Sequence, residues 1–285
     1  MSPAAPGGAD RLAADSLPAL ADLCALALGP DSPDEQELAA NLFDPSRPVV
    51  VRGDPDVGVV AAAERNGQGF IRLLVVHPAQ RRRGIGHALM EAAEGDLSGS
   101  GGITVGADAP DYLFPGVPSR LTAMFCLLES RGYQRAETNL NMTVDLEKLP
   151  PEPGGPRLAG ADDRSEVDDW TGAHWPWWRD EVLSALAKDR LLVTHDQDGL
   201  AGFCAWDVNR KGWLGPIAVR PSSMGRRVGV PLLLGALHRM RVTGRRRAEI
   251  AWISPVRFYA RTVGAEMGTA FIVARRPAPA AGAAG

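Results

Sequence analysis

Residues 73–90, LLVVHPAQRRRGIGHALM, have an altered copy at residues 216–233, PIAVRPSSMGRRVGVPLL. Both segments read as an apolar strand, a proline, a basic turn that contains glycine, and an amphipathic helix. Pro78 corresponds to Pro221 and Gly86 to Gly229, in each case 143 residues later. Because self-similarity at a fixed distance indicates a duplicated structural unit, we expect the same α/β unit twice.

The flanking segments agree with a duplication. In the first half the pattern predicts a helix over 33–42, opened by a capping box at Ser32-Pro33-Asp34-Glu35, strands over 48–52, 57–64 and 103–107, and a helix over 119–131. In the second half it predicts a helix over 176–188, strands over 190–195, 200–208 and 249–253, and a helix over 256–263. Each half therefore has the order ααβββ-αβ-αβ, an α/β (α+β) fold. The alternative is that two α/β units look alike by chance.

A linker divides the two halves. Residues 148–160, KLPPEPGGPRLAG, are dense in proline and glycine. We therefore expect an N-terminal domain over 10–147, a C-terminal domain over 161–276 and a disordered tail over 277–285, with residues 1–10 also disordered. Between matching landmarks the first domain carries 11 extra residues, which fall in 108–118, DAPDYLFPGVP.

Composition excludes several classes of protein. Hydrophobic residues make up 45% and charged residues 23% of the chain, as in soluble globular proteins. The net charge of −3 argues against a dedicated nucleic-acid-binding protein, and no apolar run is long enough for a membrane helix. The N-terminus lacks the pattern of a secretory signal, so a cytoplasmic location is expected. Cys24, Cys126 and Cys204 lie in apolar stretches and are expected to be free and buried.

The basic turn of the first copy has the features of a diphosphate-binding loop. It opens a helix, where unpartnered backbone N–H groups and the helix dipole favour an anion. Gly84 and Gly86 allow the backbone to approach a ligand, and Arg81, Arg82 and Arg83 add positive charge. The loop is neither a Walker loop nor a dinucleotide fingerprint. The alternative is an ordinary connection with a solvated basic face.

The pattern R-x-x-G-x-G after a strand ending in V-x-P resembles motif A of the GNAT superfamily of acyl-coenzyme A (CoA) N-acyltransferases, and the order of elements extends the resemblance over nearly the whole chain. It implies two tandem GNAT-like domains, each a mixed, splayed β-sheet flanked by helices, with acetyl-CoA as co-substrate and no metal. The implied pyrophosphate loop consists of Arg81, Arg82, Arg83, Gly84, Ile85, Gly86, His87 and Ala88. Leu74, Val75 and Val76 would face the pantetheine arm. Residues 112–118, YLFPGVP, and 252–264, WISPVRFYARTVG, are similar to tandem GNAT proteins that acetylate glucosamine and glucosaminides.

The two copies differ where the resemblance matters most. In the second copy Arg227 stands at the position of Gly84, so we expect the first copy to hold acetyl-CoA; a shifted loop at Gly225 is the alternative. Family members often carry a tyrosine in the last helix that protonates the leaving thiolate, and Tyr259 of the second copy matches it. The corresponding stretch of the first copy, 124–128, has no hydroxyl. We favour catalysis in the first copy, with Tyr112 or water as the acid. The alternative is catalysis in the second copy. Tyr259 is either the acid of the second copy or a packing residue.

The implied reaction is direct attack of a neutral amine on the thioester in a ternary complex. It needs a base for the amine proton and a backbone N–H group for the oxyanion. The candidate bases are Glu64, His77, Asp108 and Asp111, and the insertion favours the last two.

The expected acceptor is a primary amine of a small molecule. Amino sugars are one candidate class, because the aromatic side chains of 112–114 and 175–178 could stack on a sugar ring; core packing is the alternative for both groups. We expect no nucleic-acid or membrane partner, and a monomer or homodimer. The rival function is a non-catalytic tandem protein that senses acyl-CoA or another ligand.

Overall fold

The computed structural model describes residues 10–278, which divide into two units. Unit 1 contains the described residues of 10–108, 112–138 and 271–278, and unit 2 contains 109–111 and 139–270. The ends expected to be disordered lie almost wholly outside the described residues. The expectation is wrong at Pro277, which is the last residue of strand β12 (Glu266–Pro277) and lies opposite Gly102.

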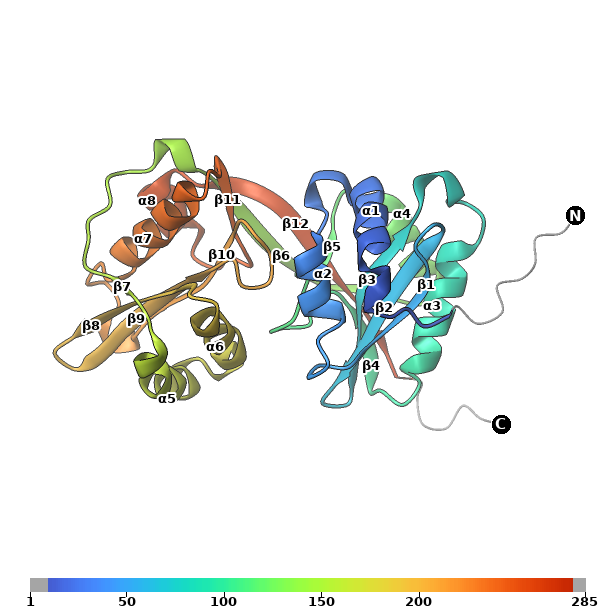
Figure 1. Ribbon diagram of the computed structural model, residues 1–285, viewed down its shortest axis with the longest axis horizontal. Helices are drawn as coiled ribbons and strands as arrows, with labels where there is room; N and C mark the ends of the chain where they lie inside the picture. Colours follow the sequence, from blue (N-terminus) through green and yellow to red (C-terminus); the bar gives the residue numbers. More distant parts are fainter. Residues whose placement is uncertain (1–9, 279–285) are drawn as a thin grey trace, which may run out of the picture. The chain divides into compact units, whose positions relative to one another are not determined.

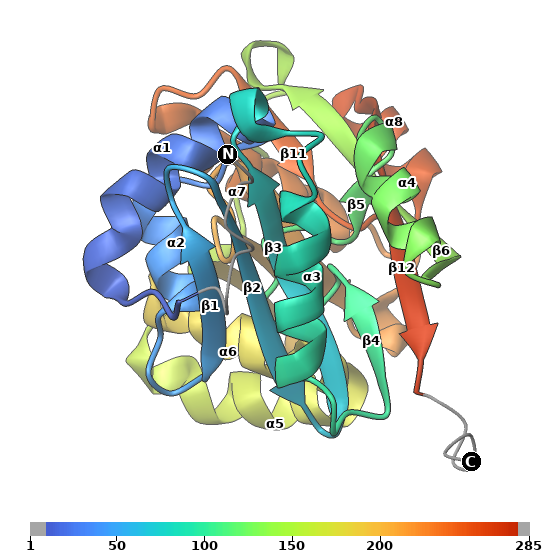
Figure 2. The ribbon, with the colours of Figure 1, turned by 90° about the vertical axis from the view of Figure 1, so that its right-hand side faces the viewer.

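Unit 1 is a mixed sheet with helices on both faces (Figure 1; Figure 2). Its elements along the chain are α1 (Leu17–Leu28), α2 (Glu35–Leu42), β1 (Val49–Asp54), β2 (Gly58–Arg65), β3 (Gln68–Val76), α3 (Ile85–Asp96), β4 (Gly102–Val105), β5 (Val117–Pro118), α4 (Thr122–Ser130) and the start of β6 (Gln134–Asp145). The strand order is β1-β2-β3-β4-β12, in which only β3 and β4 run parallel. Side chains alternate along β2: Val60 and Ala62 join the core under α3 and α4, while Val59 and Ala61 are buried on the opposite face.

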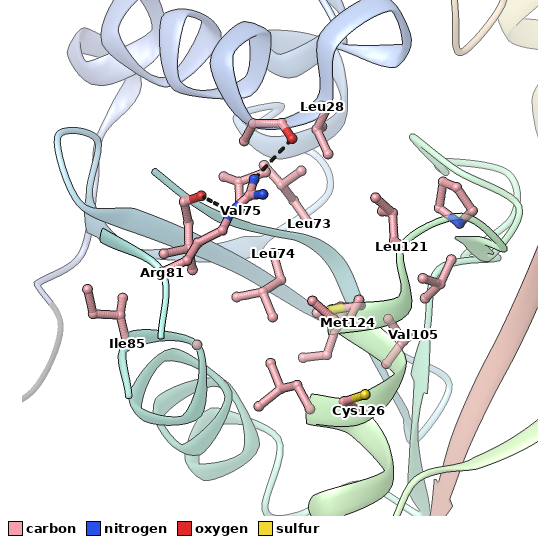
Figure 3. A pocket seen from close by; sticks show the side chains of 18 of the residues that line it. Leu28, Leu73, Leu74, Val75, Arg81, Ile85, Val105, Leu121, Met124 and Cys126 are labelled. Atoms are coloured by element: carbon pink, nitrogen blue, oxygen red, sulfur yellow. Dashed lines mark hydrogen bonds between the residues drawn. The ribbon is translucent and has the colours of Figure 1, made fainter. Parts of the chain in front are cut away.

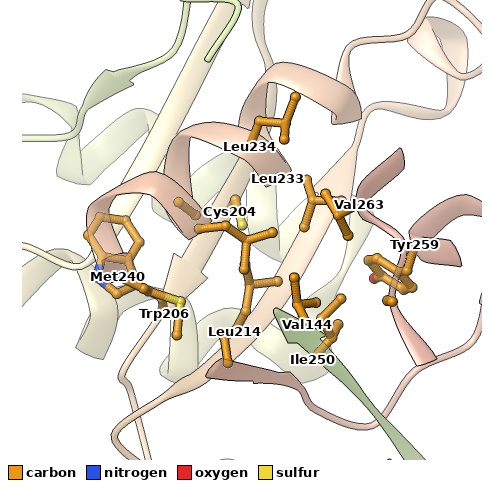
Figure 4. Close-up of a cluster of buried hydrophobic side chains, with 14 of the residues drawn as sticks. Val144, Cys204, Trp206, Leu214, Leu233, Leu234, Met240, Ile250, Tyr259 and Val263 are labelled. Atoms are coloured by element: carbon orange, nitrogen blue, oxygen red, sulfur yellow. The ribbon is translucent and has the colours of Figure 1, made fainter. Parts of the chain in front are cut away.

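Unit 2 repeats this plan. Its elements are β7 (Arg157–Leu158), α5 (Arg164–His174), α6 (Arg179–Ala187), β8 (Leu191–Asp196), β9 (Gly199–Trp206), β10 (Trp213–Val219), α7 (Gly229–Val242), β11 (Arg247–Ile250) and α8 (Val256–Val263). The strand order is β6-β11-β10-β9-β8-β7. Cys204 and Trp206 of β9 lie in the core beneath α7 and α8 (Figure 4), whereas Phe203 and Ala205 lie in the core beside α5 and α6. The predicted order ααβββ-αβ-αβ is thus confirmed in both halves.

Each unit is completed by a strand from the other half of the sequence. Residues 142–145, at the end of β6, pair with β11 of unit 2. Residues 274–277, at the end of β12, pair with β4 of unit 1, and Phe271 and Ile272 pair with β5. The two halves therefore exchange their last strands, which nothing in the sequence analysis predicts.

The start of α2 differs from the prediction. The capping box is formed by Asp34 and Glu37, not by Ser32 and Glu35: the Asp34 carboxylate accepts the Glu37 N–H group at 2.9 Å, and the Glu37 carboxylate accepts the Asp34 N–H group at 2.7 Å. Pro33 precedes the cap, so the helix begins at Glu35.

The cysteines differ from the prediction in one respect. Cys24, Cys126 and Cys204 are all free, but only Cys24 and Cys204 are buried. Cys126 is exposed because it lies on the side of α4 that faces a cavity.

Candidate functional site

A cavity of about 660 Å³ opens in unit 1 where β3 and β4 separate (Figure 3). The two strands pair only from Gly69 to Ile71, opposite Ile103 to Val105, and the Gly106 N–H group donates to the Ile71 carbonyl at 2.9 Å. Beyond Ile71, β3 continues to Val76 with no partner on the β4 side. The sheet is therefore splayed at this point, and α1, α3 and α4 contribute the remaining walls.

A β-bulge marks the point of separation. Leu73 lies opposite Ala61 and Ile71 lies opposite Ala62, so Arg72 is the extra residue of β3. The Arg72 side chain is buried, and its Nε donates to Asp108 at 2.5 Å while its Nη1 donates to the Asn41 carbonyl at 2.7 Å. These bonds hold the bulge, which redirects the strand away from β4.

The free edge of β3 presents backbone groups to the cavity. The His77 N–H group donates to the Val57 carbonyl at 3.0 Å, so His77 and every second residue before it, Val75 and Leu73, direct their backbone groups toward β2. Because backbone groups alternate along a strand, those of Leu74 and Val76 point away from β2 and into the gap. An extended molecule between the strands would find donors and acceptors there.

The N-terminus of α3 forms one end of the cavity. The first bond of the helix runs from the Ala88 N–H group to the Gly84 carbonyl at 3.1 Å, and no side chain caps the helix. The N–H groups of Ile85, Gly86 and His87 precede that bond, and all three residues line the cavity. Gly84 has φ of +80°, and a Cβ added there would meet no protein atom within 4 Å. The backbone angle thus favours glycine at 84, and the space beside it is open to an anion.

The three arginines of the loop have different surroundings. Arg81 donates from Nε to the Val76 carbonyl and from Nη2 to the Ala27 carbonyl, both at 3.2 Å, so it joins the loop to the end of α1 (Figure 3). Arg83 donates to Gln80 at 2.9 Å and does not line the cavity, and neither does Ala88. Arg82 is exposed, lines the cavity and has φ of +63°.

The other predicted cofactor-binding residues all line the cavity. They are Leu74, Val75, Val76, Gly84, Ile85, Gly86 and His87. Their role in binding stays a prediction.

The predicted catalytic carboxylates do not line this cavity. Asp108 is buried between two arginines. Arg65 donates to one carboxylate oxygen of Asp108 at 2.9 Å and Arg72 donates to the other at 2.5 Å, so both oxygens are engaged in ion pairs. Asp111 and Tyr112 are also buried and outside the lining, as is Tyr259, which lies in the core of unit 2 (Figure 4). Burial raises the pKa of the Tyr259 hydroxyl. A catalytic role for these four residues stays a prediction, and their positions give it no support in the described cavity.

The aromatic groups considered for sugar stacking have mixed positions. Phe114 is buried and lines the cavity. Trp175 and Trp178 stack on each other at 5.0 Å and pack on the core of unit 2, whereas Trp177 is 63% exposed.

Sequence reasoning missed three charged residues of the lining. One is Arg72, and the other two, Asp31 and Arg120, form an ion pair. They are 89 residues apart and belong to no motif, so no signal in a single sequence could have paired them.

The loops of the two copies have positive φ angles at the same two positions, but glycine occupies a different one of the two in each copy. In unit 1 Arg82 and Gly84 have φ of +63° and +80°; at the corresponding positions of unit 2, Gly225 and Arg227 have φ of +80° and +62°. Arg227 thus takes the conformation of Gly84 without a shift of the loop. A Cβ on Gly229 would lie 3.3 Å from the Phe258 ring.

Comparison with known proteins agrees with this geometry. Residues 45–134, which include β3, the loop and α3, match the family described as an acetyltransferase (GNAT) domain. Residues 45–134 of the chain therefore form a GNAT acetyltransferase domain. The GNAT domain match covers the cavity's β3 wall and the whole of the predicted pyrophosphate loop.

Relatives and solved structures extend the likeness beyond the first GNAT domain. The chain is 30% identical to a mycothiol acetyltransferase of Kineococcus radiotolerans over 195 residues. This matched stretch covers 63% of this chain and 62% of that relative. A tandem GNAT protein from the clavulanic acid biosynthesis pathway superposes with a TM-score of 0.69 at 19% identity, over 94% of this chain and 98% of that one. The glucosamine N-acetyltransferase region of a fungal multi-domain β-N-acetylglucosaminidase superposes with a TM-score of 0.76 at 17% identity, over 96% of this chain and 38% of that one. The fold is therefore a tandem GNAT fold. Among the described helices, none has the length and apolar character needed to cross a membrane.

Proposed function

We propose that this chain is an acetyl-CoA-dependent N-acetyltransferase, with unit 1 as the catalytic unit. The observation that carries the proposal is the cavity that runs from the gap between β3 and β4 to the uncapped N-terminus of α3. An open strand edge at one end and a positive helix end at the other suit a ligand that is a polar chain ending in a diphosphate.

The residues of unit 1 fit acetyl-CoA, which when bound would supply an activated acetyl group. The N–H groups of Ile85, Gly86 and His87 would bind the pyrophosphate, with Arg82 nearby as a counter-charge. The backbone of Leu74 and Val76 would hold the pantetheine arm in an extended conformation, and an N–H group of this edge would stabilise the developing oxyanion.

The proposed acceptor is the primary amine of a small molecule, with amino sugars as the first class to test. The names of the mycothiol acetyltransferase and of the fungal glucosamine N-acetyltransferase region support small-molecule acceptors. Water is the simplest proton donor for the leaving thiolate, because Tyr112 does not line the cavity. A cytoplasmic location, the absence of a metal and a monomeric or homodimeric state stay predictions.

Release of free thiol tests the proposal. The purified chain is mixed with acetyl-CoA and, in turn, glucosamine, spermidine and glycinamide, and CoA is followed with DTNB; glucose replaces glucosamine as the matched control without an amine. We expect amine-dependent release and an acetylated product by mass spectrometry. Calorimetric binding of CoA without release for any amine would favour the rival function of an acyl-CoA sensor.

A further inference from the structure

The charges that line the unit 1 cavity are strongly unbalanced. Four arginines contribute to the lining: Arg72, Arg81, Arg82 and Arg120. Among the described lining residues, Asp31 is the one side chain with a carboxylate. An ammonium group that enters this cavity therefore finds a carboxylate partner in the lining at Asp31.

Asp31 is paired with Arg120 across the cavity. Asp31 lies in the short 3₁₀ helix after α1, and Arg120 lies between β5 and α4, so the ion pair joins two different walls. Their side chains are 30% and 47% exposed. An ion pair this exposed is worth at most about 1 kcal/mol, so a competing cation can replace one partner.

Two of the other cations, Arg72 and Arg81, are bound in a way that Arg120 is not. Arg72 is buried and bonded to Asp108 and Asn41, and Arg81 donates to two backbone carbonyls. Arg120 is half exposed and can turn into solvent when its place is taken. Exchange at Asp31 thus needs no rearrangement of the core.

We propose that Asp31 is the acceptor-binding residue of unit 1: the ammonium group of the acceptor displaces Arg120 and binds the Asp31 carboxylate. This inference rests on the proposed function and deepens it, because it defines the acceptor as an amine that binds in its protonated, cationic form. The bound ammonium gives up a proton to water before the neutral amine attacks the thioester. Asp31 then determines specificity for cationic acceptors, and Arg120 competes with them for the same carboxylate.

The test compares the two partners of the ion pair in steady-state kinetics with glucosamine. Asp31→Asn is expected to raise KM for glucosamine by about two- to fivefold, because an exposed ion pair with the ammonium group is lost, while KM for acetyl-CoA stays within twofold. Arg120→Gln is expected to lower KM for glucosamine by about two- to fivefold, because the competitor is removed. Opposite shifts from the two partners separate this role from a structural one, since loss of a structural ion pair would shift both variants in the same direction.

Controls keep the inference separate from the proposed function. Asp22→Asn changes an exposed carboxylate of α1 outside the lining and is expected to behave as wild type. Calorimetry on CoA-saturated protein should show glucosamine, but not glucose, binding to wild type and binding weakened in Asp31→Asn. Transfer that is unaffected by Asp31→Asn, or KM shifts in the same direction for both variants, would overturn the inference and leave the acetyltransferase proposal standing. A wild type that binds glucosamine through Asp31 without releasing CoA would overturn only the acetyltransferase.

Discussion

Two positive-φ positions recur in the loop before α3 of unit 1 and in the loop before α7 of unit 2. Glycine occupies the second position in unit 1 (Gly84) and the first in unit 2 (Gly225), and arginine fills the other position each time. A side chain in the left-handed region costs roughly 1–2 kcal/mol, so each loop is strained at one position. The difference between the units lies in where the Cβ atom stands, beside the helix N-terminus in unit 2 and away from it in unit 1.

Gly84→Glu is expected to abolish CoA binding. A glutamate at this position would place a carboxylate in the open space beside the α3 N-terminus and would also force a side chain into φ of +80°. Isothermal calorimetry with CoA measures the loss. The matched variant Arg227→Glu in unit 2, at the position that corresponds to Gly84, is expected to retain most of the binding. Two binding sites, or binding that survives Gly84→Glu, would show that unit 2 holds the ligand.

Arg227→Gly is expected to stabilise unit 2. Glycine adopts φ of +62° without strain, so the gain from relieved strain should exceed the added entropy of the unfolded chain and leave roughly 0.5–1 kcal/mol. Urea denaturation measures the change. Arg226→Gly is the matched control, because Arg226 is not among the positive-φ residues, and it should stabilise nothing. Equal effects of both substitutions would contradict the strain argument.

At the scale of elements, Glu94 joins α3, α4 and β12. Its carboxylate accepts from Arg131 at 2.6 Å and from Arg276 at 2.8 Å, and it accepts the Tyr133 hydroxyl at 3.2 Å. Burial acts to raise the pKa of Glu94, but the hydrogen bonds from Arg131 and Arg276 outweigh it and lower the pKa below its ordinary value of 4.5. The Glu94 side chain is only 10% exposed, so these bonds are shielded from water.

The stability of unit 1 is therefore expected to fall in acid. A carboxylate whose pKa is lowered on folding contributes stability that is fully present above pH 4.5 and is lost as the pH falls through the folded value. Glu94→Gln should lower the free energy of unfolding by about 2 kcal/mol at pH 7 and flatten the decline below pH 4.5. Urea denaturation from pH 3 to 7 measures both, and Glu91→Gln, on the exposed side of α3, is the control. An unchanged pH profile for Glu94→Gln would remove Glu94 from this role.

The sequence predicts the elements and the loop well, because hydrophobic period, proline and glycine act over short distances. It does not predict that Asp108 is buried between two arginines, since its partners lie 36 and 43 residues away. The Asp31–Arg120 pair is invisible for the same reason. Nor can it predict the strand exchange, because β6 and β12 have the same alternating pattern whichever β-sheet they join.

At the scale of the whole molecule, residues 271–277 belong to unit 1 although they lie at the far end of the chain. Ending the chain after Ala270 removes no residue that lines the cavity, yet it leaves the β4 edge unpaired. We expect this truncation to abolish CoA binding and the hydrogen-exchange protection of 102–105, while protection of β8 and β9 persists. A chain ending after Ala278 is the control, and CoA binding by the shorter chain would show that β12 is dispensable for the cavity.

The exchanged strands also set the order in which the protein is finished during synthesis. Most of unit 1 is translated before unit 2, but its sheet is incomplete until β12 is made. The unit 1 part of β12 follows Thr138 by more than 130 residues. At about 5–20 residues per second that wait lasts roughly 7 to 27 seconds. Throughout it, the nascent chain carries an open β4 edge, so the half of the protein that the ribosome makes first is the last to become a closed structure.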